Sequence, residues 1–169
     1  CTGKTTLLSI LTHFIPKDER IITIEDTPEL KIKHANWVQM ISRDQEIEKK
    51  GVVGFRDLIK NACRMRPDRL LIGETRGIEM LDMLIAMNLG TCGIMTTCHA
   101  NSSRDALKRL EIMALLADSK ISINLIKELI SKTIHILVHL EKKGANRTLI
   151  EIVNLCGLEN DTYTLERVF

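Results

Sequence analysis

The chain has 169 residues, of which 44% are hydrophobic and 27% are charged, a composition typical of one globular domain and not of a disordered segment. Its 24 basic and 22 acidic residues leave a formal net charge of +2, and aromatic residues make up 3%. The sequence therefore offers neither a broad basic footprint for nucleic acid nor many aromatic platforms for stacking single strands.

The first half of the chain predicts helices that alternate with short buried strands. A helix is expected from Lys4 to about His13, followed by an apolar, β-branched strand over residues 20–25. A further strand is expected over residues 37–41. An amphipathic helix is expected over residues 55–65, and Pro67 ends it.

The second half continues this alternation and then changes to paired strands. In chain order we expect a strand over 69–74, a helix over 77–88 with Gly90 as its cap, a strand over 92–97, a helix from Ser102 or Ser103 to about Leu116, and a helix over 123–131. Three final strands are expected over 133–140, 147–155 and 162–168. This order predicts an α/β fold, with a mostly parallel sheet covered by helices and an antiparallel extension at the carboxyl terminus.

The cysteines bear on the redox compartment of the protein, and the hydropathy pattern bears on membrane-spanning segments. The five cysteines are scattered and odd in number, which fits a reducing, cytoplasmic setting better than a disulfide scheme. No apolar window is long enough to cross a membrane, and we expect no signal peptide within these residues.

The segment Gly3-Lys4-Thr5-Thr6 opens the first predicted helix and matches the end of the phosphate-loop pattern. Backbone N–H groups at a helix amino terminus face phosphates. Lys4 would place a positive charge on the β- and γ-phosphate oxygens, and Thr5 would offer its hydroxyl to Mg²⁺. The alternative is an ordinary amino-terminal helix with a solvated lysine.

Acidic side chains follow two of the predicted buried strands. Glu74 ends one of them, at the place where nucleotide motors hold an acid beside Mg²⁺ and the attacking water. The alternative is a carboxylate that caps the turn before Gly77. Glu25, Asp26 and Glu29 follow the preceding strand, and carboxylates near a metal-bound phosphate can orient or deprotonate water. Such a cluster alone would be a solvated turn, but open α/β sheets bind ligands at this edge.

Four segments, taken in order, resemble the type II/type IV secretion traffic ATPase superfamily over nearly the whole chain. They are Gly3-Lys4-Thr5-Thr6, the run from Ile24 to Leu30, the run from Arg64 to Gly77, and the run from Thr96 to Ser102. Within the superfamily, the match is most similar to the tight-adherence (Tad/Cpa) pilus-assembly branch. The resemblance implies a RecA-like P-loop NTPase core in a ring of six subunits. Residues 1–169 would be the carboxy-terminal ATPase domain, entered within its Walker A loop, with the family's amino-terminal domain outside them.

The resemblance also implies roles for individual residues. The Walker A residues that would bind ATP are Gly3, Lys4, Thr5 and Thr6. The catalytic residues would be Glu25 and Glu29 of an acidic box, Glu74 of Walker B and His99 of a His box. Thr5 and Glu74 would hold Mg²⁺, partly through water.

Several arginines fall where the family carries arginines, and three of them are candidates to neutralise phosphate charge, within the subunit or across the ring. These three are Arg43, Arg56 and Arg66. The alternative is that such arginines only pair with nearby acids at the surface, where ion pairs contribute little.

The sequence also departs from the family pattern. Thr91 stands where a family histidine is usual, which leaves His99 alone. The hairpin segment over residues 141–146 lacks the usual Arg and Asp-Gly turn.

The function predicted from the residues and the resemblance is Mg²⁺-dependent ATP hydrolysis by a hexameric ring motor. The motor would power pilus assembly or protein secretion by acting on an inner-membrane platform protein, at the cytoplasmic face of that membrane. One alternative is a nucleic-acid-translocating ATPase of the conjugative or helicase-like kind, which the charge balance disfavours. Another is a regulatory module that binds nucleotide without hydrolysing it.

Overall fold

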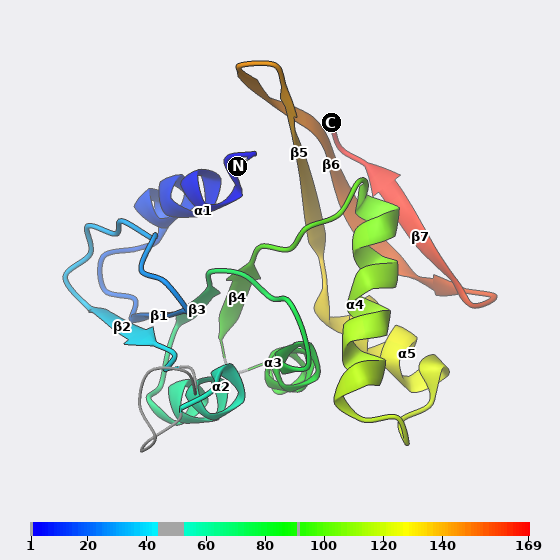
Figure 1. The fold of residues 1–169 in the computed structure, drawn as a ribbon, viewed down its shortest axis with the longest axis horizontal. Helices are drawn as coiled ribbons and strands as arrows, with labels where there is room; N and C mark the ends of the chain where they lie inside the picture. Colours follow the sequence, from blue (N-terminus) through cyan, green and yellow to red (C-terminus); the bar gives the residue numbers. More distant parts are fainter. Residues whose placement is uncertain (1, 44–52, 91) are drawn as a thin grey trace. The chain divides into compact units, whose positions relative to one another are not determined.

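The computed structural model describes residues 2–43, 53–90 and 92–169, and the chain divides into two compact units (Figure 1). The parallel-sheet unit comprises residues 5–75 and 89–97. The antiparallel-sheet unit comprises residues 1–4, 76–88 and 98–169. Within the described residues, every helix is too short or too polar to cross a membrane.

The parallel-sheet unit is built on four strands in the order β2-β1-β3-β4. The strands are β1 (Ile21–Glu25), β2 (Trp37–Ile41), β3 (Arg69–Ile72) and β4 (Gly93–Thr96). Every neighbouring pair is parallel, so the carboxyl ends of all four strands lie at one edge of the sheet.

Burial explains why the central strands have nearly continuous apolar sequences. All five residues of β1 are buried, as are the last three of β3, a pattern typical of parallel strands covered on both faces. Helix α2 (Phe55–Arg64) packs on β1 and buries Leu58, Ile59 and Ala62. Helix α1 (Lys4–Leu11) continues into the short 3-10 helix η1 (Thr12–Phe14), and its Leu8 joins a buried cluster with Ile21 and Leu71.

The antiparallel-sheet unit combines three helices with a three-stranded sheet. Helices α3 (Glu79–Asn88), α4 (Ser103–Ala117) and α5 (Ile123–Thr133) pack against one another. Strands β5 (Ile136–Lys143), β6 (Asn146–Glu159) and β7 (Thr162–Arg167) form antiparallel pairs in the order β5-β6-β7. The central strand β6 has 14 residues, and the register shifts at His139/Leu140 and at Leu155/Gly157.

The predicted fold class and order of elements are confirmed, with differences at some boundaries. Strands β3 and β4 end at Ile72 and Thr96, so Glu74 lies in the loop after β3. Helix α3 begins two residues later than expected, because the Glu79 carboxylate accepts the backbone N–H groups of Arg76 and Gly77 at 2.6 and 2.9 Å. Strand β6 runs beyond its expected end and forms a hairpin with β7.

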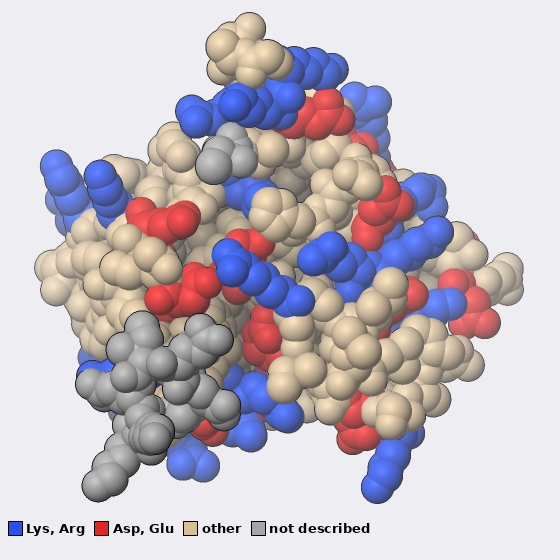
Figure 2. All heavy atoms as spheres, viewed as in Figure 1, with Lys and Arg blue, Asp and Glu red and all other residues tan. Residues whose placement is uncertain are grey.

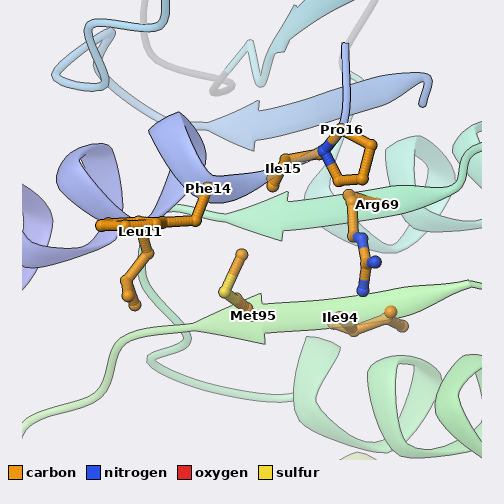
Figure 3. Close-up of a pocket in the computed structure, with 8 residues that line it drawn as sticks. Leu11, Phe14, Ile15, Pro16, Arg69, Ile94 and Met95 are labelled. Carbon is orange, nitrogen blue, oxygen red and sulfur yellow. The ribbon is translucent and has the colours of Figure 1, made fainter. Parts of the chain in front are cut away.

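A hollow of about 290 Å³ lies in the parallel-sheet unit and is mostly apolar (Figure 3). It is lined by Leu11, Phe14, Ile15, Pro16, Arg69, Gly93, Ile94 and Met95. The Arg69 guanidinium is already paired with the carboxylate of Glu19 at 2.5 Å. None of the predicted site residues lines this hollow.

Candidate active site

The carboxyl edge of the parallel sheet carries the predicted acidic residues on segments that stay side by side beyond the strands. The Gly73 N–H donates to the Ile24 carbonyl oxygen at 2.9 Å, and the Thr97 hydroxyl donates to the Gly73 carbonyl oxygen at 2.7 Å. One residue further on, the Thr75 N–H donates to the Thr97 carbonyl oxygen at 3.0 Å. The ends of β1, β3 and β4 are therefore tied together where ligands bind in open α/β sheets.

Glu25 ends β1 and is almost completely buried, with 2% of its surface exposed. Its Oε1 accepts the backbone N–H groups of Glu29 and Leu30 at 2.9 and 2.8 Å, and its Oε2 accepts the Gln39 amide at 3.0 Å. The buried carboxylate thereby fixes the loop after β1 and leaves the Glu29 side chain exposed. Of the two predicted acids, Glu25 is therefore held by its hydrogen bonds and Glu29 is the one presented to solvent.

Gly73 allows β1 and β3 to approach closely at this edge. A Cβ atom at position 73 would lie 3.1 Å from Cγ of Glu25 and 3.6 Å from the Ile24 carbonyl oxygen. Because Ile24 pairs with Ile72, Gly73 lies level with Glu25, and Glu74 lies one residue beyond. Glu74 follows Gly73 directly and is half-buried.

The three candidate arginines do not lie together. Arg43 follows β2 at the carboxyl edge, is exposed, and donates its backbone N–H to the Val53 carbonyl oxygen at 3.1 Å. Arg56 is the second residue of α2, three residues after Val53. Arg66 follows the other end of α2 and precedes β3, which begins at Arg69. It therefore lies at the amino edge of the sheet, and the length of β3, about 13 Å, separates that edge from the carboxyl edge.

The antiparallel-sheet unit brings together two other predicted residues that are 95 positions apart in the chain. The Lys4 amine donates toward Nδ1 of His99 at 3.4 Å, which is longer than a good hydrogen bond and makes this a weak contact. Lys4 is the first residue of α1. Gly3 before it has a φ of +94°, a conformation that glycine adopts without strain. Thr5 and Thr6 complete the first turn of α1, where Thr5 is half-buried and Thr6 is exposed.

The loop that carries His99 is anchored where α4 begins. Ser102 caps the helix, since its hydroxyl accepts the Asp105 N–H at 3.1 Å, and this confirms one of the two caps expected from the sequence. The Ser103 N–H donates to Oε1 of Glu151 on β6 at 3.1 Å. The polar groups of Ser103, its hydroxyl first and its backbone N–H second, hold the pKa of the Glu151 carboxyl below its ordinary value.

The structure also adds residues that the sequence did not single out. Glu151 and Arg147 are both on β6, and the Arg147 side chain packs against Gly3. No sequence pattern distinguished them, because a charged residue in a polar hairpin is ordinary. Thr91, which replaces a family histidine, lies outside the described residues.

The sequence is similar to a known protein family and to named members of secretion and conjugation systems. The profile of the family described as "Type II/IV secretion system protein" matches residues 1–151. The conjugal transfer protein TrbB of Rhizobium radiobacter is 32% identical over 168 residues, which cover 98% of this chain and 49% of the relative. The type IV secretion system protein PtlH of Bordetella pertussis is 36% identical over 163 residues, which cover 93% of this chain and 48% of PtlH.

A solved structure is similar as well. The VirB11 ATPase from the Brucella suis type IV secretion system, in complex with sulphate, has a TM-score of 0.81 and 32% identity. The match covers 90% of this chain and 45% of that one. The chain therefore spans about half the length of the relatives that it matches.

Proposed function

Because the chain belongs to the Type II/IV secretion system protein family, we propose that it forms the ATP-hydrolysing part of a secretion or pilus-assembly motor. The superfamily predicted from four motifs is confirmed by this membership, and the RecA-like α/β fold by the similarity to VirB11. The reaction proposed is ATP + H₂O → ADP + phosphate.

The approach of Lys4 to His99 is the observation that carries this proposal. A lysine at the start of α1 and a histidine after β4 have nitrogen atoms 3.4 Å apart. Both side chains can donate hydrogen bonds to phosphate oxygens. A phosphate group at the start of α1 would also meet the backbone N–H groups of the first helical turn.

The residues present fit ATP and Mg²⁺. Gly3 has no side chain to hinder close approach of a phosphate, and its positive φ turns the backbone into α1. Thr5 and Glu74 offer oxygen atoms, the ligands that Mg²⁺ prefers. Bound Mg²⁺ would neutralise phosphate charge, and ATP would supply the phosphoanhydride bond that water breaks.

The acidic residues would handle the attacking water. Glu74 and Glu29 are the carboxylates available to orient the water and accept its proton. Glu25 would act through them, because its Oε1 is occupied by the loop that carries Glu29 and its Oε2 by Gln39 of β2. Arg43 and Arg56, near the carboxyl edge of the parallel sheet, are proposed to neutralise phosphate charge within the subunit, and Arg66, at the amino edge, to act across a subunit boundary.

At the level of the assembly, we propose a hexameric ring bound to an inner-membrane platform protein at the cytoplasmic face. Relatives are named for type IV secretion and conjugal transfer, which supports work within an envelope-spanning machine. Placement in the Tad/Cpa branch stays a prediction from the motifs.

Phosphate release and nucleotide binding by the full-length protein test the reaction. Lys4→Ala is expected to abolish both. Glu74→Gln should keep ATP binding and slow turnover by about 10²- to 10⁴-fold, the usual effect of losing a general base. Lys17→Ala, a change at an exposed lysine outside the predicted site, is the control and should leave both unchanged.

Three outcomes would contradict the proposal. Turnover within twofold of wild type in Lys4→Ala or Glu74→Gln would refute the site assignment. ATP binding by the wild type without phosphate release would indicate a regulatory module. DNA-stimulated hydrolysis with a steep salt dependence would indicate a nucleic-acid motor.

A further inference from the structure

The β5–β6 hairpin reaches the start of the phosphate loop through one side chain. A Cβ atom at position 3 would lie 2.9 Å from Cδ of Arg147, 3.6 Å from its Nε and 3.9 Å from its Cγ. The aliphatic stem of Arg147 therefore packs directly on the backbone of Gly3, although 143 residues separate them in the chain. The guanidinium therefore begins, at Nε, beside Gly3, and the residue is exposed to solvent.

Positive charge gathers around this contact. Lys4 follows Gly3, and its amine lies 3.4 Å from the His99 ring. Lys142 is directly opposite Arg147 on β5, and Figure 2 shows Lys and Arg side chains gathered over the tip of the hairpin. Among the residues that the structure describes, no hydrogen bond or ion pair engages the Arg147 guanidinium.

We propose that Arg147 is a nucleotide-binding residue whose guanidinium holds the α- and β-phosphates of the nucleotide bound at Gly3 and Lys4. The inference rests on the proposed function, because it assigns a further residue to the same site. An unpaired guanidinium beside a lysine is stabilised when an anion arrives. Its planar, forked donors also match two oxygens of one phosphate group, which a lysine cannot do.

This role has a definite kinetic signature. ADP and ATP share the α- and β-phosphates, so loss of Arg147 should weaken both nucleotides alike. The KM for ATP should rise with the dissociation constant, while kcat stays close to wild type, because the interaction is the same in the ground and transition states.

The experiment measures the affinity of a fluorescent ADP analogue for the full-length protein, together with kcat and KM for ATP. Arg147→Gln keeps the part of the stem that packs on Gly3 and removes the charge, and it should weaken ADP binding about tenfold or more. Arg147→Lys should fall between this variant and wild type. Lys143→Gln removes the same charge from the neighbouring residue pair of the hairpin, where side chains point to the opposite face, and should bind ADP within twofold of wild type.

The outcomes separate this inference from the proposed function. If wild type binds ADP, Lys4→Ala does not, and Arg147→Gln binds within twofold of wild type, Arg147 has no role in binding and the proposed function stands. A fall in kcat with unchanged ADP affinity would also overturn the inference. If wild type binds no nucleotide, both proposals fail. Thermal unfolding without nucleotide checks the fold of each variant, and Arg147→Lys carries the test if Arg147→Gln does not fold.

Discussion

Substitutions at Glu25 and Glu29 can distinguish a residue that holds the site together from a residue that takes part in the reaction. Its buried carboxylate accepts three hydrogen bonds, two from backbone N–H groups and one from Gln39. Glu29, which these bonds position, is exposed. We expect Glu25→Gln to lower both stability and turnover, and Glu29→Gln to lower turnover alone.

The size of the stability effect follows from the change in hydrogen-bond type. A bond to a charged group contributes about 1.5–3 kcal/mol and a neutral one about 0.5–1.5 kcal/mol. Glutamine at position 25 can still accept both backbone N–H groups, so the loss is about 1 kcal/mol for each, or about 2 kcal/mol in total. Alanine would leave all three donors without this acceptor, the Leu30 N–H in a buried position, and cost about 4 kcal/mol. Glu29→Gln, at the surface, should stay within about 0.5 kcal/mol of wild type.

Thermal and denaturant unfolding, combined with a phosphate-release assay, measure both effects. In a protein of this size, 2 kcal/mol corresponds to a fall in Tm of about 4–8 °C. Both variants should turn over ATP at least tenfold more slowly than wild type. The reasoning is refuted if Glu25→Gln unfolds at the wild-type temperature, or if Glu29→Gln is destabilised as much as Glu25→Gln.

Three further predictions concern stability. Gly73→Ala should destabilise the protein by about 1–3 kcal/mol, because the new Cβ would lie 3.1 Å from Cγ of Glu25; wild-type stability in urea would show that β1 and β3 can separate there without cost. Ser102→Ala removes the cap of α4 and should cost about 1 kcal/mol, whereas Ser131→Ala, which removes a hydroxyl bonded within α5 at a half-buried position, is the control. The lowered pKa of Glu151 contributes stability that is complete above the ordinary pKa of 4.5 and is lost as pH falls through the lower folded-state value. Glu151→Gln should therefore be less stable than wild type at pH 7, and the difference should shrink as pH falls below 4.5; a constant difference would contradict this.

Most of the fold could be predicted from the sequence, because its signals are local. Strand β2 (Trp37–Ile41) has the expected bounds, and the cap at Ser102 was one of two proposed. Apolar runs indicated the buried strands, and their alternation with helices indicated a parallel sheet. Boundaries shifted where a side chain competes with the backbone, as Glu79 does before α3.

The site was predicted less completely, since its details depend on contacts between distant segments. The motifs identified Glu25 as an acid at a strand end, but only the structure shows its Oε1 bonded to the loop after β1 and its Oε2 to Gln39 of β2. Arg66 matched a family position, yet it lies at the amino edge of the sheet. Arg147 gave no signal at all, because its importance depends on a contact with Gly3 at the other end of the chain.

Strand β6 makes two such distant contacts at once. Arg147 packs on Gly3, and four residues later Glu151 accepts the Ser103 N–H where α4 begins. The two residues lie on the same strand, on either side of the register shift opposite His139/Leu140. A change in the pairing of β6 that displaced both residues would disturb the packing on Gly3 and the hydrogen bond from Ser103 together.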